Sequence, residues 1–169
     1  LARTQWTKQF LDFSDLSLNV KPQTVESQVS YDGFGDGVTL MTSPLSESTE
    51  ITGPIAAKLW VSSSTEDADL FLIVRAFDPN MKEVVFQGAL DPNTPIAQGW
   101  LRVSHRKLDP KLSLPYRPYH THDEEQKLSP DQIYEVDVEI WPTCVVLPKG
   151  FRIALTIRGK DYEYPGGPS

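Results

Sequence analysis

Two stretches late in the sequence alternate apolar and polar side chains, which predicts a pair of β-strands because successive side chains of a strand point to opposite faces. In residues 134–141 the apolar face consists of Tyr134, Val136, Val138 and Ile140, and the polar face of Glu135, Asp137, Glu139 and Trp141. In residues 151–158 the apolar face consists of Phe151, Ile153, Leu155 and Ile157. A connection with Pro at both ends joins the two stretches. Each strand would have one face in water, so a second sheet must cover the other faces, and a β-sandwich is predicted.

Earlier stretches add further strands. Residues 51–62 alternate in the same way, and Gly53-Pro54 marks an irregular entry. Residues 69–77 are apolar on both sides, as expected of a central strand that is covered on each face. Asp78-Pro79 suits the start of a type I turn, so the chain should return through residues 83–87 as a hairpin. Shorter strands are expected at residues 38–42 and 100–106.

The chain shows no convincing amphipathic helix, and its prolines concentrate in the connections. An all-β sandwich of the jelly-roll type is the economical solution for such a pattern. Residues 4–18 contain apolar side chains with neither a helical nor a strand period, which predicts an arm laid over a surface. We therefore divide the chain into an entry arm, residues 1–20, and a jelly-roll domain, residues 21–169.

Composition removes several classes of function. The net charge of −7 argues against a nucleic-acid or anionic-membrane partner, because such binding depends on clustered Lys and Arg. No apolar run is long enough to span a membrane, and no segment resembles a signal peptide. Cys144 is the only cysteine, so an internal disulfide is impossible, and a cytoplasmic location is favoured. Its apolar neighbours predict a buried thiol rather than a nucleophile.

No catalytic signature is found in the sequence. The serines at residues 62–64 lie outside any Gly-x-Ser-x-Gly elbow and are interpreted as a polar turn. His120 and His122 could ligate a metal from an extended segment, but a zinc site needs more protein ligands than this pair supplies. We therefore expect neither a metal nor a cofactor. Trp60, Trp100 and Trp141 could form a sugar-stacking platform, so a free-standing carbohydrate-binding module is the alternative function.

The order of the motifs resembles a known family. LARTQWTK is followed by EITGPIAAKLWVSSSTEDADLFLIVRAFDP, then by WLRVSHR with a proline-rich loop, and finally by LSPDQIYEVDVEIWPTCVVLPKGFRIALTIRGKDYE. Together these segments resemble the carboxy-terminal non-catalytic domain of the X-Pro dipeptidyl-peptidase and cocaine-esterase (CocE/NonD) group of serine hydrolases. The resemblance implies a galactose-binding-like jelly roll that follows an α/β-hydrolase domain carrying the Ser-Asp-His triad. None of the triad positions is in this chain, so we expect it to be a non-catalytic piece of a larger hydrolase.

The resemblance also implies a role. The domain would pack on the α/β-hydrolase domain of the same parent chain and help to wall its substrate cleft. Residues 108–130 form a long irregular loop, and loops of this length are usually functional or disordered. We expect this loop and the strand before it to face the catalytic domain through amphipathic side chains: Trp100, His105, Tyr116, Tyr119, His120 and His122. The sequence leaves open whether the parent cleaves X-Pro peptides, esters or acylated antibiotics. An interface left exposed would also allow copies of the chain to associate.

Overall fold

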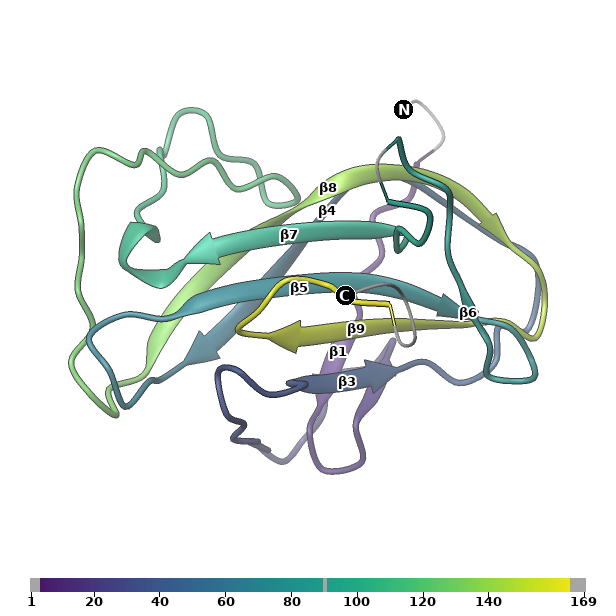
Figure 1. Ribbon diagram of the computed structural model, residues 1–169, viewed down its shortest axis with the longest axis horizontal. Helices are drawn as coiled ribbons and strands as arrows, with labels where there is room; N and C mark the ends of the chain where they lie inside the picture. Colours follow the sequence, from purple (N-terminus) through teal and green to yellow (C-terminus); the bar gives the residue numbers. More distant parts are fainter. Residues whose placement is uncertain (1–3, 90, 165–169) are drawn as a thin grey trace.

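The structure is a computed structural model that describes residues 4–89 and 91–164. Within these residues the chain forms strands and one short 3-10 helix, and no α-helix (Figure 1). The elements are β1 (Phe10–Asp12), β2 (Ser17–Asn19), β3 (Val38–Met41), β4 (Thr49–Val61), β5 (Asp69–Phe77), β6 (Glu83–Val84), β7 (Ala97–Arg102), η1 (Val103–His105), β8 (Tyr134–Leu147) and β9 (Arg152–Arg158). The predicted all-β sandwich is confirmed, while its galactose-binding-like subclass stays a prediction.

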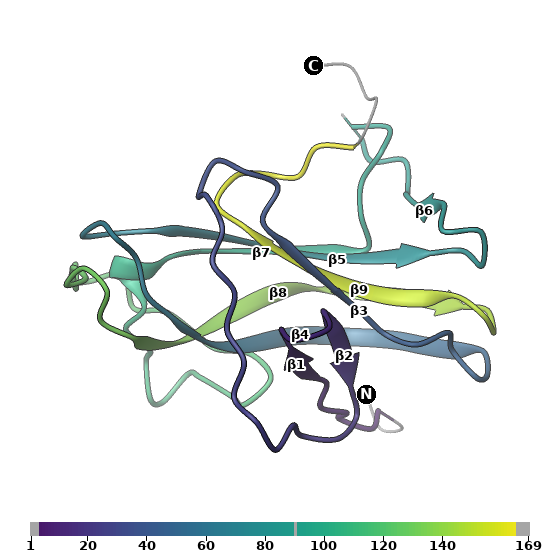
Figure 2. The same ribbon diagram turned by 90° about the horizontal axis from the view of Figure 1, so that it is seen from below.

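The strands are divided between two sheets. The larger sheet has the order β1-β2-β3-β9-β5-β6, with β7 also paired to β5. The second sheet contains only β4 and β8, which are antiparallel. Figure 2 shows β5, β7 and β9 in one layer and β4 and β8 in the other. Between the layers lies the hydrophobic core, whose largest fully buried side chains include Leu40, Leu72, Val136, Val138 and Ile140.

The predicted end of the strand that begins at residue 134 is wrong. Strand β8 does not end at residue 141 but continues through Pro142 to Leu147, paired with β4 along its length. The register shifts so that Trp141 and Pro142 lie opposite Pro54 alone, which is a β-bulge. A proline is tolerated at a bulge because no ladder hydrogen bond is required there. Both prolines that seemed to interrupt a strand therefore fall at the same irregularity.

Strand β9 lies in the larger sheet between β3 and β5, and its expected wet face is buried. Thr156 is only 3% exposed and Arg158 only 7%. Next to them, the Arg75 guanidinium donates hydrogen bonds of 2.8 and 2.6 Å to both oxygens of Glu83. The hydroxyl of Tyr162 donates to the same carboxylate at 3.0 Å, and burial together with this carboxylate raises the pKa of Tyr162. The segment after β9 thus covers the outer face of the larger sheet.

The turn at Asp78 and the short strand β6 follow β5. The hairpin at Asp78 forms, since the Met81 N–H donates to the Asp78 carbonyl at 2.9 Å, although β6 is shorter than expected. Met81 has a φ of 64°, a conformation that glycine adopts most easily.

The expected irregular arm contains the β1–β2 hairpin, which joins the larger sheet where Ser17 pairs with Met41. The division of the chain at residue 20 stays a prediction. Cys144 is exposed rather than buried, because it lies on the outer face of the extended β8.

The sandwich is closed on one side where β7 lies against β8. Gly99 permits this contact, since an added Cβ would lie 2.1 Å from the Glu139 carbonyl oxygen and 2.9 Å from the Ile140 Cα. Both of these atoms belong to the backbone of β8, so a small rotation of a side chain cannot relieve the clash. The neighbouring residue, Trp100, is thereby brought to the surface of β8. Gly99 therefore controls the distance between the two sheets at this side.

We predict that Gly99→Ala lowers the free energy of unfolding by about 1–3 kcal/mol, because the new methyl group forces β7 away from β8. Urea unfolding followed by circular dichroism measures the change. Gly33→Ala is the matched control, since an added Cβ at Gly33 meets no atom within 4 Å. Equal stability of the two variants would show that the contact between β7 and β8 is looser than described.

Candidate functional site

The three histidines of the chain gather at one corner of the sandwich. The His105 and His122 rings have centroids 5.4 Å apart, and their Nδ1 atoms are 3.3 Å apart. The His120 ring lies 5.9 Å from that of His122. We use the term histidine corner for these residues and the three that adjoin them: Trp100, His105, His120, His122, Glu139 and Trp141. Four of the six predicted site residues therefore come together: Trp100, His105, His120 and His122.

A small hollow opens in the histidine corner. The rings of Trp100 and Trp141 meet edge to face, with centroids 5.3 Å apart and an interplanar angle of 81°. With them, Arg102, His120, His122 and Glu139 line a hollow of about 200 Å³. This volume is below the roughly 300–1,000 Å³ of sites for drug-sized ligands. The hollow therefore suits a single side chain or a small ligand group.

The electrostatics of the hollow come from one buried imidazole and one carboxylate. Burial lowers the pKa of His120, which keeps the ring neutral. Its Nε2 is buried and has no hydrogen-bond partner among the described residues. The Arg102 guanidinium at the rim donates 2.9 and 3.1 Å hydrogen bonds to Asp69, so its charge is already paired. Glu139 forms no ion pair within the described part of the chain, which leaves its charge available.

The position of His105 depends on the 3-10 helix η1. The predicted strand at residues 100–106 is displaced, since β7 ends at Arg102 and η1 follows it. The Asp67 carboxylate accepts hydrogen bonds from the Ser104 N–H at 2.9 Å and from the Ser104 hydroxyl at 2.7 Å. Burial raises the pKa of Asp67, but these bonds and one from the Ala68 N–H outweigh it, so the pKa is lowered. Asp67 thus holds the turn that presents His105.

The proline-rich loop between η1 and β8 contains no strand, as expected, and is ordered by local hydrogen bonds. Isolated bridges join Leu108 to His120 and Leu114 to Arg117. At its end, the Arg106 guanidinium donates to the Gln126 carbonyl and lies 4.5 Å from the centre of the Tyr134 ring. These contacts fasten both ends of the loop to the sandwich. The loop is therefore held in a defined path beside the two-stranded sheet.

Tyr116 and Tyr119 lie apart from the histidine corner. The Tyr116 ring stacks on Trp6 of the arm, with centroids 3.8 Å apart and an interplanar angle of 10°. Tyr119 is exposed and forms no part of the hollow. The sequence thus predicted the loop as a surface element but did not predict its contact with the arm. It also placed Glu139 and Trp141 on an outer face without assigning them to the site.

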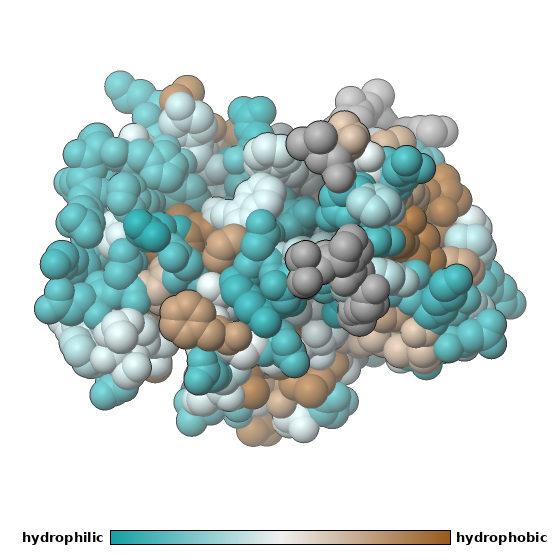
Figure 3. Space-filling model, in the orientation of Figure 1, coloured by the Kyte–Doolittle hydropathy of each residue, from teal (hydrophilic) through white to brown (hydrophobic). Residues whose placement is uncertain are grey.

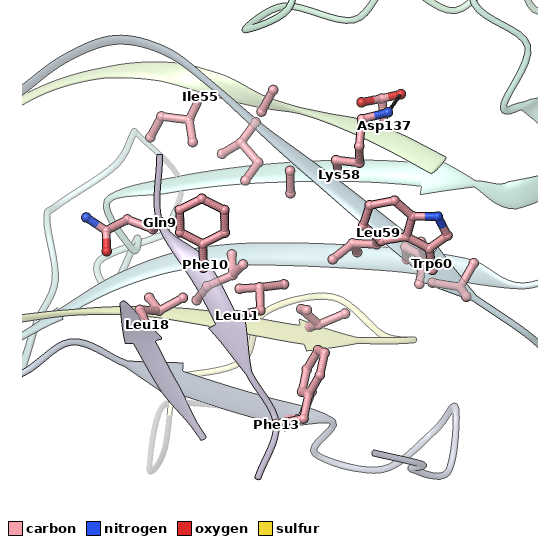
Figure 4. Close-up of a pocket in the computed structure, with 18 of the residues that line it drawn as sticks. Gln9, Phe10, Leu11, Phe13, Leu18, Ile55, Lys58, Leu59, Trp60 and Asp137 are labelled. Atoms are coloured by element: carbon pink, nitrogen blue, oxygen red, sulfur yellow. Dashed lines mark hydrogen bonds and ion pairs between the residues drawn. The ribbon is translucent and has the colours of Figure 1, made fainter. Parts of the chain in front are cut away.

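A second surface lies on the other side of β4. The edge of β4 and the β1–β2 hairpin border an apolar trough, and Figure 4 shows Phe10, Ile55 and Leu59 among its lining side chains. Lys58, on the outer face of β4, donates to Glu135 and, at 2.9 Å, to Asp137. Trp60 follows it on the same face and is exposed. The trough and this outer face form a continuous surface with the arm.

The three tryptophans of the alternative sugar-stacking platform do not lie in one row. Trp100 and Trp141 meet at right angles, whereas Trp60 pairs across from Glu135, six residues away from Trp141 along β8. At about 3.3 Å per residue, Trp60 and Trp141 are separated by roughly 20 Å. Perpendicular, widely spaced rings do not provide the flat surface on which sugar rings stack. No group of three or more His, Cys, Asp or Glu residues that could hold a metal is found among residues 4–89 and 91–164.

Comparison with known proteins identifies the family. The family model of the X-Pro dipeptidyl-peptidase C-terminal non-catalytic domain matches residues 7–167. The chain belongs to this family. A crystal structure of a CocE/NonD family hydrolase from Staphylococcus aureus superposes on the domain with a TM-score of 0.90 and 31% identity, covering 97% of this chain and 30% of the hydrolase. The resemblance inferred from the motifs is confirmed.

More distant relatives agree with this assignment. A putative serine esterase from Mycobacterium bovis is 26% identical over 132 residues, which is 75% of this chain and 19% of the esterase. An aminopeptidase from a marine sediment archaeon shares the fold, with a TM-score of 0.55 and 17% identity. The chain thus spans about a fifth of the curated relatives that it matches. It is a C-terminal non-catalytic domain of the CocE/NonD hydrolase type. No helix long and apolar enough to cross a membrane occurs in the described part of the domain.

We predict that Asp67→Ala lowers the free energy of unfolding by about 1–3 kcal/mol at pH 7, because it leaves the buried Ser104 donors without an acceptor. The pKa of Asp67 is lowered by folding, so its stabilisation is complete above the unfolded value near 4 and is lost as the pH falls through the folded pKa. The difference between the wild type and the variant should therefore shrink below about pH 4. Urea titrations at several pH values measure it.

Asp69→Ala is the matched control for this measurement. Asp69 lies two residues away and pairs with Arg102 on the exposed surface, where ion pairs add little stability. Its removal should cost clearly less than removal of Asp67. Equal losses at Asp67 and Asp69 would contradict the assigned role of Asp67.

Proposed function

We propose that this domain packs on the α/β-hydrolase domain of its parent chain and helps to wall the substrate cleft of that domain. The observation that carries the proposal is the exposure of all four tryptophans: Trp6 is 51% exposed, Trp60 64%, Trp100 40% and Trp141 63%. Tryptophan is highly buried on average, and it is enriched where protein surfaces bind each other. A domain that keeps every tryptophan out of its core presents the residues of an interface.

The tryptophans lie around the two-stranded sheet. Trp60 and Trp141 are on its outer face, Trp100 contacts Trp141, and Trp6 stacks on the loop residue Tyr116. Charged side chains, among them Lys58 and Glu135, lie between Trp60 and Trp141, so exposed aromatic anchors with a polar surround, as in protein–protein interfaces, border this sheet. A partner on this side would contact the arm, the proline-rich loop and the histidine corner together. We infer that Trp100, His105, Tyr116, Tyr119, His120 and His122 all lie on the side facing the catalytic domain.

The opposite surface differs in character. Polar side chains cover most of the face seen in Figure 3, which is the outer side of the larger sheet. Met81 lies in the turn between β5 and β6 of this larger sheet and is 52% exposed. It belongs neither to the two-stranded sheet nor to the histidine corner. It therefore provides a position for a control substitution.

The names of the relatives favour one class of substrate for the parent. The Mycobacterium relatives are named putative serine esterases, so we infer that the parent hydrolyses esters in preference to X-Pro peptides. A free-standing carbohydrate-binding module is the weaker alternative, because the tryptophans form no flat row. Association between copies of the chain through the same tryptophan surface, a cytoplasmic location and the lack of a nucleic-acid partner stay predictions.

We predict that Trp60→Ala lowers the melting temperature of the full-length parent by several degrees but leaves that of the 169-residue chain within about one degree. The reason is that a mostly exposed tryptophan contributes little to its own domain and about 2 kcal/mol or more at the centre of an interface. Differential scanning fluorimetry of both proteins measures the two shifts. Met81→Ala, in the turn between β5 and β6 of the larger sheet, is the control and should change neither melting temperature.

The role in the cleft is tested separately, by kinetics of the full-length parent. Alanine variants of Tyr116, Tyr119 and His120 should change the ratio of kcat/KM between a small and a bulky acyl ester by about threefold or more, whereas Met81→Ala should not. Wild-type specificity together with a wild-type melting temperature in all three variants would refute the proposed function.

A further inference from the structure

We propose that the hollow in the histidine corner binds a guanidinium or ammonium group, the charged end of an arginine or lysine side chain. The proposal goes beyond the packing of the domain on a partner, because it names the chemical group that one part of the surface accepts. The acceptors, the aromatic rings, the local charge and the size of the hollow all favour such a group.

The lining of the hollow contains both acceptors and donors of hydrogen bonds. The His120 ring is neutral, and its buried Nε2 has no hydrogen-bond partner among the described residues. Glu139 adds a carboxylate, which only accepts when ionised. The donors of the lining are the indole N–H groups and Arg102, whose Nε and Nη2 groups already bind Asp69. The Glu139 carboxylate is therefore the charged acceptor that a ligand donating hydrogen bonds would satisfy.

Two indole rings border the hollow. Trp100 and Trp141 are held edge to face, and both keep part of their surface exposed. The face of an indole attracts cations more strongly than any other aromatic side chain does, with about 0.5–2 kcal/mol per contact. A cation in the hollow would meet these rings and the Glu139 carboxylate at the same time. A neutral ligand of the same shape would lose both attractions.

The charged groups around the hollow leave one carboxylate without a cation. Lys58 is already shared by Glu135 and Asp137, and Arg102 is paired with Asp69. Glu139 lies on β8 next to this set and has no cation of its own among the described residues. Burying an unpaired carboxylate under a partner is costly unless a cation accompanies it. An anion is disfavoured for the same reason.

The size of the hollow limits the ligand to the end of a side chain. A volume of about 200 Å³ holds a guanidinium group with a few methylene groups, but not a folded peptide segment. The cation can come from the catalytic domain of the parent or from a molecule in solution. Both sources share the same chemistry, and the experiment below distinguishes them.

The test is an NMR titration of the 169-residue chain with ethylguanidinium chloride, followed through the indole N–H signals of its four tryptophans. We expect saturable shifts for Trp100 and Trp141 and none for Trp6 and Trp60. N-ethylurea has nearly the same shape without the charge and should give no saturable shift. Glu139→Gln and Trp141→Ala should weaken ethylguanidinium binding by roughly 3- to 30-fold.

Two control variants match these changes. Glu135→Gln removes a carboxylate from the same strand face, and Trp60→Ala removes a tryptophan of nearly equal exposure. Both should leave binding unchanged, and the melting temperature of each variant verifies that it is folded. Binding of N-ethylurea as tight as that of ethylguanidinium, or shifts produced by methyl galactoside in its place, would overturn the proposal. Equal weakening by the control variants, or no saturable shift at all, would do the same.

The same titration of the full-length parent identifies the source of the cation. If ethylguanidinium binds the 169-residue chain but not the parent, a side chain of the catalytic domain already fills the hollow. If it binds both proteins, the hollow is open to a ligand from solution. Either result supports the cation site. Failure of the proposed packing would appear instead in the melting temperatures of the Trp60 variants, so the two proposals can fail separately.

Discussion

The contact between the backbone of β8 and Gly99 of β7 is the constraint on which the candidate site depends. Two sheets of a sandwich normally pack about 10 Å apart, with side chains between them. At Gly99 there is no side chain, and an added Cβ would lie 2.1 Å from the Glu139 carbonyl oxygen. The sheets therefore meet directly along this side. Trp100, on the larger sheet, can then contact Trp141, on the two-stranded sheet.

The same contact explains why the histidines gather. The chain leaves β7 through η1, whose turn is held by Asp67, and this places His105 against His122. The proline-rich loop then returns to β8 and brings His120 and His122 to the same corner. Residues from three separate segments thus surround one hollow. A change in the spacing between β7 and β8 would alter all of its walls at once.

The sequence predicted what depends on local alternation. The faces of β8 and the strand type of β5 follow from side-chain period, because burial on one or both faces selects apolar residues position by position. Strand pairing does not follow from period. Pro142 looked like the end of a strand, yet it lies at a bulge opposite Pro54, a match that no single stretch of sequence contains. For the same reason the exposure of Cys144 was predicted incorrectly.

The site was predictable in type but not in arrangement. Long loops rich in Tyr and His are typical of surfaces that bind, so His120 and Tyr116 were reasonable candidates. Glu139 and Trp141 appeared only as outward positions of an alternating strand, because their partner, Trp100, is distant in sequence. Such a contact depends on the close approach at Gly99, and a glycine in a strand has several possible explanations. The structure selects one of them.

The separation of core and surface has a consequence for how this domain can change. Its core consists of Leu, Ile, Val and Ala side chains, and no tryptophan belongs to it. Substitutions of Trp60 and Trp141 therefore remove little of the apolar area that stabilises the sandwich, since these side chains are 64% and 63% exposed to water. Stability and recognition are set by different residues. A substitution at an exposed position of the histidine corner or the proline-rich loop can therefore change what this surface contacts while the sandwich keeps its core.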